Sequence, residues 1–184
     1  SDLLSKLSPA ETLLILDEGA ADFDDLLKTT LSNLLLTNVL EVIKVQRKSR
    51  QSGRLKSFFF VKRGSNWGKI KAKRHEIAFL RPFILKANLK IYYSEYVKEL
   101  IENHTSRKDL IKKILHSKNS KEAFSFGFLF FFMGAPKLSK KGKELKTKIQ
   151  KELVATKNKL QHSSHSDIAN LINSIEGNLF LIQD

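Results

Sequence analysis

The pattern of apolar and polar residues predicts two helices near the start of the chain. Ser8, a proline and Glu11 form a capping box, in which each side chain accepts a hydrogen bond from the backbone amide of the other residue. This motif starts a helix over residues 9–18, and Gly19 supplies its C-terminal stop. Residues 22–38 carry apolar side chains at spacings of three and four, which predicts the second helix.

The pattern then changes to alternation. Residues 39–46 and 55–62 are rich in β-branched and aromatic side chains, and they predict two strands. Between them, residues 48–54 contain Ser-Arg-Gln-Ser-Gly and read as a turn, so the segment predicts a β-hairpin. Residues 70–79 fit either a strand or a helix, and we expect Pro82 to end whatever precedes it.

The second half of the chain returns to helical spacing. Four helices are expected there: over 94–103, after the N-cap Ser106, after the N-cap Ser139, and over 167–176. The apolar run 124–133 holds six phenylalanines and predicts a buried strand. Residues 178–183 are expected to form an extended tail.

Composition limits the class of protein. The chain has 184 residues, 41% of them hydrophobic, which is typical of a globular protein. It has no cysteine, which excludes disulfides, zinc–thiolate sites and a thiol nucleophile and fits a reducing compartment. The first residues lack the pattern of a secretory signal, and the apolar run 123–133 is shorter than the roughly 20 residues that span a bilayer. We therefore expect a cytoplasmic protein.

The charge of the chain is concentrated in one segment. The formal net charge is +14. Residues 42–90 hold 15 basic residues and one acidic residue, whereas residues 1–41 hold two basic and eight acidic ones. Such a concentration indicates a polyanionic partner.

The basic residues of this segment are the candidate binding site. They are Lys44, Arg47, Lys48, Arg50, Arg54, Lys56, Lys62, Arg63, Lys69, Lys71, Lys73 and Arg74. A row of cations of this kind is what a phosphate backbone requires. If residues 69–73 are extended, their three lysines share a face. The alternative interpretation is a solvated surface in a lysine-rich protein.

The Ser-Pro-Ala-Glu helix, the leucine-rich helix and the hairpin with a basic turn together resemble the winged-helix family. Residues 138–145 are similar to the stretch that follows the wing in many such regulators. The resemblance implies a mostly α, α+β protein with a winged-helix-like module over 1–90, packed on a helical second half over 91–184. Because both halves run helix, helix, apolar strand, the second half is open to interpretation as a degenerate second unit of the same kind.

The groove-reading role of a winged-helix protein does not carry over to residues 22–38. Helix-turn-helix proteins place a recognition helix in the major groove. Here Lys28 is the one basic residue against three aspartates, and phosphates would repel a helix of that balance. We therefore expect the hairpin and the residues after it to make any contact with DNA.

A second resemblance is to the Golgi phosphoprotein 3-like family of phosphoinositide binders. Members of that family open with a Leu-x-x-x-Glu-x-Leu-Leu helix, which matches Leu7, Glu11, Leu13 and Leu14. The family holds its lipid headgroup with a tryptophan and arginines near the next helix. Residues 22–38 have neither.

Aromatic residues have two interpretations each. Trp67 lies among basic residues, and we favour packing against the core over stacking on a base or insertion into a membrane interface. In strands, the phenylalanines of residues 58–60 and 124–132 face both sides, so both sides must be covered. We therefore expect these rings to lie in the core, with a dimer face as the alternative.

We find no set of residues that predicts catalysis. His162, His165 and Asp167 lie close together in a serine-rich stretch but lack the further ligand that a metal site needs. No phosphate-binding glycine loop and no paired carboxylates in an apolar setting are present. We expect no enzyme activity, no cofactor, no metal and no small-molecule substrate.

The leading hypothesis is a nucleic-acid-binding protein, regulatory or accessory, that contacts phosphates through the basic hairpin and residues 69–74. Two alternatives stay open. One is a protein-interaction or oligomerisation module, such as a homodimer in which acidic helices meet the basic segment of a second copy. The other is peripheral binding to an anionic membrane.

Overall fold

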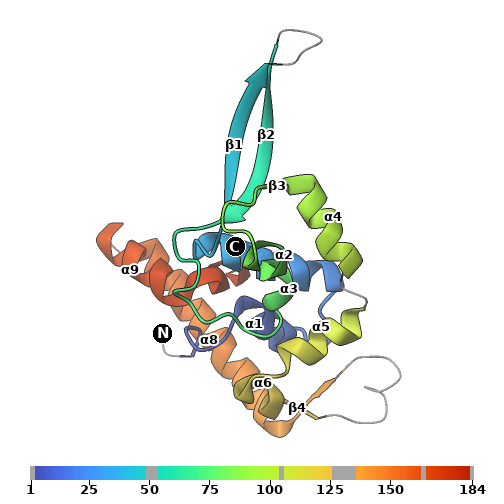
Figure 1. The fold of residues 1–184 in the computed structure, drawn as a ribbon. Helices are drawn as coiled ribbons and strands as arrows, with labels where there is room; N and C mark the ends of the chain where they lie inside the picture. Colours follow the sequence, from blue (N-terminus) through green and yellow to red (C-terminus); the bar gives the residue numbers. More distant parts are fainter. Residues whose placement is uncertain (1–2, 49–53, 104–105, 126–135, 163–164, 183–184) are drawn as a thin grey trace. The chain divides into compact units, whose positions relative to one another are not determined.

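The structure of the chain is a computed structural model that describes residues 3–48, 54–103, 106–125, 136–162 and 165–182. It is an α+β protein, mostly helical, with a small antiparallel sheet, as expected (Figure 1). The chain forms two compact units. Unit 1 consists of Ser1–Asn33 and Ser106–Asp184, and unit 2 is Leu34–Thr105. These units differ from the division at residue 90 that we expected.

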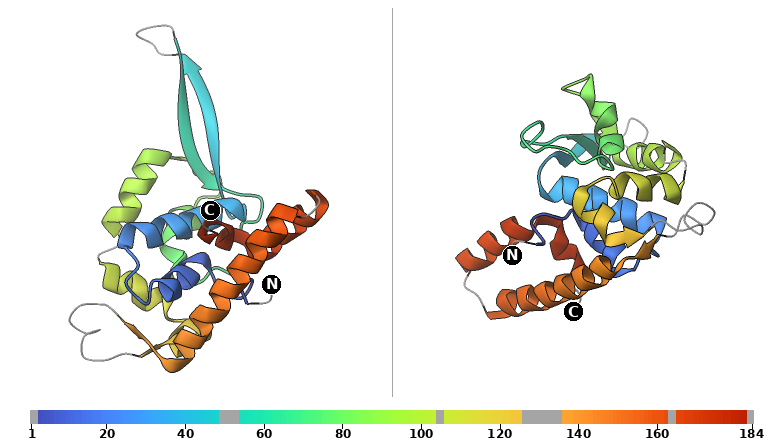
Figure 2. Two further views of the ribbon diagram at one scale, coloured as in Figure 1. Left: turned by 180° about the vertical axis from the view of Figure 1, so that it is seen from behind. Right: turned by 90° about the horizontal axis from the view of Figure 1, so that it is seen from below.

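Unit 1 contains most of the helices. Its elements are α1 (Pro9–Leu16), most of α2 (Phe23–Leu36), α5 (Arg107–Ile114), α6 (Lys118–Ala123), β4 (Phe124–Ser125), β5 (Lys137–Leu138), α8 (Lys140–His162), α9 (His165–Ile175) and the 3-10 helix η1 (Glu176–Leu181). Helix α8 is the long orange helix in both views of Figure 2. It contacts α1, α6 and α9, so it organises the unit.

The start of α1 confirms the capping box. The Ser8 amide donates to the Glu11 carboxylate at 2.6 Å, and the Glu11 amide donates to the Ser8 hydroxyl at 3.3 Å. The same carboxylate accepts from the hydroxyls of Ser117 and Ser120, the latter at 2.7 Å. Glu11 is therefore a buried acid that joins the N-terminus of α1 to the N-terminus of α6. Helix α1 ends at Leu16, two residues before the predicted end, and Glu18 (φ +53°) is the left-handed residue that follows its C-cap. Gly19 (φ +87°) comes next, and its amide donates to the Leu14 carbonyl at 2.8 Å.

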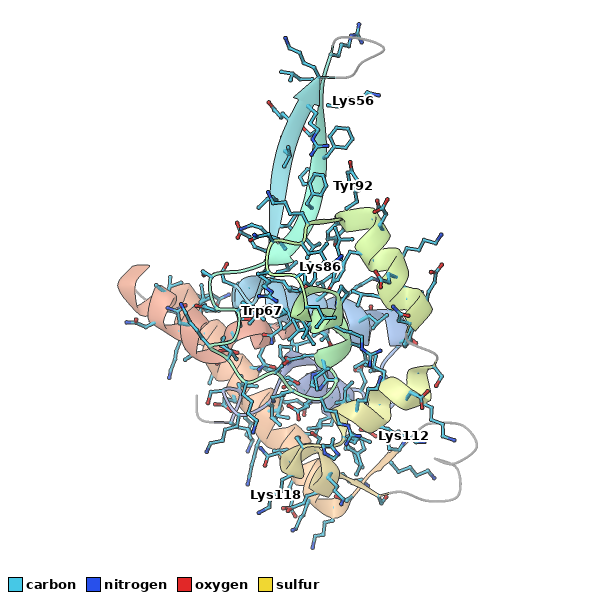
Figure 3. All side chains as sticks on the ribbon, in the orientation of Figure 1. Lys56, Trp67, Lys86, Tyr92, Lys112 and Lys118 are labelled. Carbon is cyan, nitrogen blue, oxygen red and sulfur yellow. The ribbon has the colours of Figure 1, made fainter. Side chains whose placement is uncertain are left out.

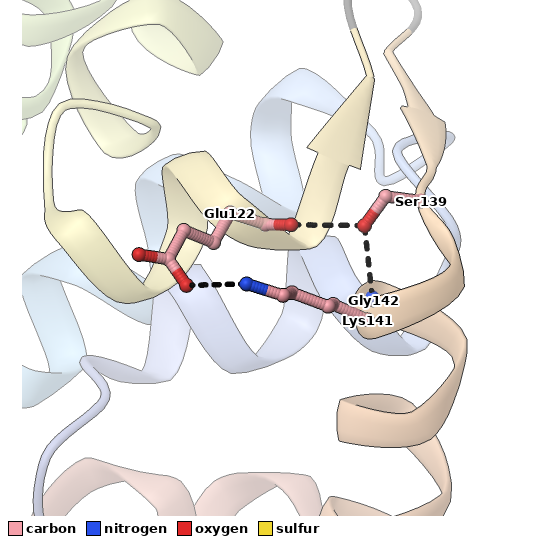
Figure 4. A network of polar contacts seen from close by, with 4 residues as sticks. All are labelled: Glu122, Ser139, Lys141 and Gly142. Carbon is pink, nitrogen blue, oxygen red and sulfur yellow. Dashed lines mark hydrogen bonds and ion pairs between the residues drawn. The ribbon is translucent and has the colours of Figure 1, made fainter.

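Ser139 begins α8, as predicted. Its hydroxyl accepts from the Gly142 amide at 3.1 Å and donates to the Glu122 carbonyl at 2.8 Å (Figure 4). Gly142 lies where α8 passes the end of α6, and a Cβ there would collide with the Ala123 carbonyl oxygen. The Lys141 ammonium approaches the Glu122 carboxylate at 3.5 Å beside this contact.

Two expectations for unit 1 need revision. Residues 178–183 were expected to be extended, but residues up to Leu181 belong to η1. The tail turns because the buried side-chain amide of Asn178 donates to the Leu4 and Leu7 carbonyls at 2.8 and 3.0 Å. The strand expected over 124–133 begins as β4, and its remainder lies outside the described residues.

Unit 2 contains the predicted hairpin. Strands β1 (Leu40–Lys48) and β2 (Leu55–Arg63) pair antiparallel over nine residues each. Strand β3 (Ile91–Tyr92) pairs with β2 only at Phe60 and Val61. The outer part of the hairpin is therefore a two-stranded ribbon, drawn in cyan in Figure 1.

Two helices complete unit 2. They are α3 (Ile77–Ile84) and α4 (Tyr93–Asn103), and the Tyr96 hydroxyl donates to the Phe79 carbonyl at 2.9 Å. Phe79, Phe83 and Tyr96 are fully buried. The expectation that Pro82 ends this segment is wrong, because Pro82 lies inside α3. The guanidinium of Arg63 donates to the carbonyls of the last turn of α3, which stabilises the helix beyond the proline.

None of the described helices is both long and apolar enough to cross a membrane.

Candidate nucleic-acid interface

The register of the hairpin decides which side chains lie together. Residues paired across antiparallel strands lie on the same face of the ribbon. Arg47 pairs with Lys56, Lys44 with Phe59, and Lys48 with Leu55. Because the faces alternate along each strand, the first pair lies on one face and the other two pairs lie on the opposite face.

We call the first face the tyrosine face. It includes Arg47, Lys56, Phe58, Phe60 and Tyr92, and the register also places Glu41, Ile43, Val45 and Lys62 on it. The Tyr92 ring lies 4.4 Å from the Phe60 ring and 6.1 Å from the Phe58 ring, measured between centroids. The Arg47 guanidinium lies 5.7 Å from the Phe60 centroid, a cation–π contact. The aromatic rings of this face therefore pack on one another, and Lys56 lies farther out on β2 (Figure 3).

We call the second face the open face. It presents Val42, Lys44, Gln46, Lys48, Leu55, Ser57 and Phe59, and every one of these side chains is exposed. Half of the Phe59 surface and 62% of the Leu55 surface are accessible to solvent. Among the described residues, no aromatic or cation–π contact involves the Phe59 ring.

The charge of the hairpin is positive toward its outer end. Its described acidic residue is Glu41, near the base, where the carboxylate pairs with the Lys62 ammonium at 2.8 Å. Five cations lie farther out and are exposed: Lys44, Arg47, Lys48, Arg54 and Lys56. The predicted site residue Arg50 lies outside the described residues.

Arg63 has a structural position. Its Nε donates to the Phe83 carbonyl at 2.9 Å, and one of its terminal nitrogens donates to the Ile84 carbonyl at 2.9 Å. Its guanidinium carbon lies 4.6 Å from the Trp67 centroid. The half-buried Trp67 meets Phe83 edge to face at 6.3 Å, which agrees with the interpretation of Trp67 as packed against the core. We therefore leave Arg63 out of the proposed interface.

The basic residues after the hairpin are less regular. Residues 65–76 form turns and irregular backbone, so alternation does not place Lys69, Lys71 and Lys73 on one face. Lys69, Lys71 and Arg74 are exposed. The Lys73 amide donates to the Glu76 carboxylate at 2.7 Å, which orders the turn before α3.

The structure brings together five of the predicted residues on the outer hairpin and adds neighbours that the charge count missed. These neighbours are Gln46, Leu55, Ser57 and Phe59 of the open face. Alternation in the sequence places the middle one of three consecutive phenylalanines on the face opposite the other two, but it does not say which face is exposed.

Other chemistry is limited in the described part of the chain. It holds no group of three or more histidines or acids placed to bind a metal. His162 makes a 2.8 Å hydrogen bond between Nδ1 and the Asn158 carbonyl, and the side chains of 165–167 are not described. In unit 1, residues of α1, α8 and η1 line an open pocket of about 490 Å³ with a mixed polar and apolar lining. Partial burial raises the pKa of the Asp17 carboxyl, which lines this pocket.

Comparison of the chain with protein-family models, with curated proteins and with solved structures finds no match.

Proposed function

We propose that this protein is a non-enzymatic nucleic-acid-binding protein that contacts phosphates through the outer part of the β1–β2 hairpin. The observation that carries the proposal is the set of five exposed cations there, with the acid Glu41 engaged by Lys62 at the base. Phosphate contacts supply most of the affinity of such proteins and need cations in a row more than any special geometry.

The shape of the hairpin supports the same proposal. A two-stranded β-ribbon is one of the elements that the major groove of DNA admits. Cations on both faces can reach phosphates on either side of a groove, and the exposed Lys69, Lys71 and Arg74 add positive charge to the same unit. The winged-helix-like interpretation belongs to this proposal, with the hairpin as the wing.

Helix α2 is not part of the proposed interface. Its first turn carries Asp24 and Asp25, both exposed. The wing alone would then carry the contact, without a recognition helix.

Fluorescence anisotropy with labelled random-sequence DNA, as duplex and as single strand, tests the proposal at several salt concentrations. The test variant changes Lys44, Arg47, Lys48 and Lys56 to glutamine. The control variant changes four exposed lysines of α8 in unit 1 to glutamine and so removes the same charge. These are Lys140, Lys148, Lys151 and Lys159. We expect binding that weakens log-linearly with salt, a loss of at least tenfold in the test variant, and a smaller loss in the control.

Two results would contradict the proposal. One is absence of binding at low salt. The other is an equal loss in both variants, which would mean that net charge, and not the hairpin, attracts the nucleic acid.

A second candidate function is self-association through opposite charges. Unit 1 carries five acids within nine residues, Asp17, Glu18, Asp22, Asp24 and Asp25, of which Glu18 is paired with Lys146 at 2.8 Å. A second copy could present its hairpin to this surface. Sedimentation velocity at low and high salt tests this candidate. It requires an oligomer at low salt that dissociates as the salt concentration rises. The glutamine variant of the hairpin should be monomeric even at low salt.

A further inference from the structure

We propose that the open face of the hairpin binds single-stranded nucleic acid, with a base stacked on the Phe59 ring. This inference rests on the proposed function and names its substrate class. It also assigns a role to a residue that is not charged.

The first step is the separation of the three phenylalanines. Phe58 and Phe60 lie on the tyrosine face, where Tyr92 packs on both rings. Phe59 lies on the opposite face with half of its surface exposed. Exposure of a large ring costs free energy that burial would recover. An exposed ring that contacts no other ring among the described residues is therefore suited to a ligand.

The second step is the set of side chains around the ring. Lys44 lies directly across from Phe59, and Lys48 lies farther out on the same strand, about 13 Å along it. Between them, Gln46 pairs with Ser57. The face therefore combines a ring for stacking, two ammonium groups for phosphates, and an amide and a hydroxyl that can bond base edges.

The third step is the choice of single strand over duplex. In a duplex the bases stack on one another, and their flat faces are not accessible to a side chain without unstacking. In a single strand each base offers a free face, and stacking on an aromatic side chain tolerates every base. Phe59 adds affinity only for the second kind of ligand, whereas Lys44 and Lys48 add affinity for both.

The experiment uses substitutions of Phe59 that separate aromatic stacking from apolar contact. Phe59→Leu keeps an apolar side chain, and Phe59→Trp keeps a ring. Leu55→Ala is the matched control, because it removes exposed apolar surface from the same face without touching a ring. The probes are a fluorescein-labelled 20-nucleotide thymidine oligomer and a random-sequence duplex of 20 base pairs, and retention of the fold is checked by circular dichroism.

We expect Phe59→Leu to weaken binding of the oligomer by about 5- to 150-fold, the range that corresponds to loss of one base–aromatic stack. Binding of the duplex should change less than twofold, and Leu55→Ala should change neither. Phe59→Trp should restore binding. In a Trp67→Phe background, the emission of that new tryptophan should be quenched by the oligomer, which reports contact directly.

Three results would overturn the inference. If Phe59→Leu binds the oligomer as tightly as the unchanged protein, stacking is absent, and the proposed function still stands if the glutamine variant of the hairpin fails to bind. If Phe59→Leu weakens the oligomer and the duplex equally, the ring does not select single strands. If no nucleic acid binds but anionic vesicles or a second copy do, both proposals fail, and the exposed ring belongs to a membrane or protein contact.

Discussion

The guanidinium of Arg63 lies over the ring of Trp67 while its nitrogens hold the carbonyls at the end of α3. One side chain thus joins the base of the hairpin to a helix about twenty residues later in the chain. Arg63 therefore has a structural role, although it belongs to the most basic segment of the chain.

Removal of this guanidinium should destabilise unit 2. We expect Arg63→Gln to lower the free energy of unfolding by about 2 kcal/mol, because charge-assisted hydrogen bonds and a cation–π contact are lost together. Urea denaturation followed by the emission of Trp67, the one tryptophan of the chain, measures this locally. Arg63→Lys should recover only part of the loss, since an ammonium cannot fork between two carbonyls. Arg54→Gln, at an exposed site of the same hairpin, should leave the midpoint almost unchanged, and equal effects at the two positions would contradict the assignment.

The buried hydroxyl of Tyr96 should make stability fall at alkaline pH. Burial raises the pKa of this phenol above its ordinary value near 10. As pH rises, the phenol of the unfolded chain therefore loses its proton before that of the folded protein. The free energy of unfolding falls as a result above about pH 10. Tyr96→Phe removes this contribution and also the hydrogen bond to Phe79, at a cost of about 1 kcal/mol at neutral pH.

Free energies of unfolding, measured from mildly to strongly alkaline pH, give the difference between the unchanged protein and the Tyr96→Phe variant. The two proteins share every titratable group except Tyr96, so effects common to both cancel in the comparison. The stability advantage of the unchanged protein should narrow above about pH 10, where the phenol of the unfolded chain ionises. An advantage that stays constant with pH would show that the phenol titrates normally.

Glu11 should be among the most sensitive polar positions of unit 1. Glu11→Ala leaves the Ser8 amide and the hydroxyls of Ser117 and Ser120 without their acceptor in a buried site, and we expect a loss of about 3 kcal/mol. Ser8→Ala, which removes the N-cap alone, should cost about 1 kcal/mol. Thermal or urea unfolding followed by far-ultraviolet circular dichroism measures both.

A double-mutant cycle tests the bridge between α1 and α6. If Glu11 and Ser120 act through their contact, the double variant should lose less than the sum of the single variants. Strict additivity would mean that the contact contributes nothing to stability.

The close approach of α6 and α8 should exclude a side chain at residue 142. Alanine normally favours a helix over glycine by about 1 kcal/mol. At Gly142, however, the new methyl group would meet the Ala123 carbonyl, and we expect a net loss of about 1 to 3 kcal/mol, with the range set by how far the helices can separate. Thr147→Ala on the exposed side of the same helix is the control and should be neutral or slightly stabilising. If Gly142→Ala stabilises the protein as that control does, the two helices do not pack as closely as described.

Local signals in the sequence predicted those parts of the fold that depend on neighbouring residues. The Ser8–Glu11 box, the turn at Gly19 and the cap at Ser139 each act within a few residues. Alternation together with β-branched and aromatic side chains located β1 and β2. Strand β3 is two residues long and exists because it meets β2, and η1 turns because Asn178 binds carbonyls near the N-terminus. No short window of sequence contains that information.

The candidate site divides in the same way. Charge counting found Lys44, Arg47 and Lys56, which lie on the hairpin because their strands could be predicted. It also included Arg63, whose partners on α3 are about twenty residues away and invisible to composition. It omitted Phe59, because only the register of the pairing shows which ring faces solvent.

The two units also differ in when the chain can complete them. Unit 2 is one continuous stretch, Leu34–Thr105, inserted between the two parts of unit 1. On the ribosome, every residue of unit 2 is available before the second part of unit 1 is made, whereas α1 must wait for α8 and η1, which it contacts. The order of synthesis thus lets the basic hairpin and its supporting helices assemble while α1, which is made earlier, still lacks its partners α8 and η1.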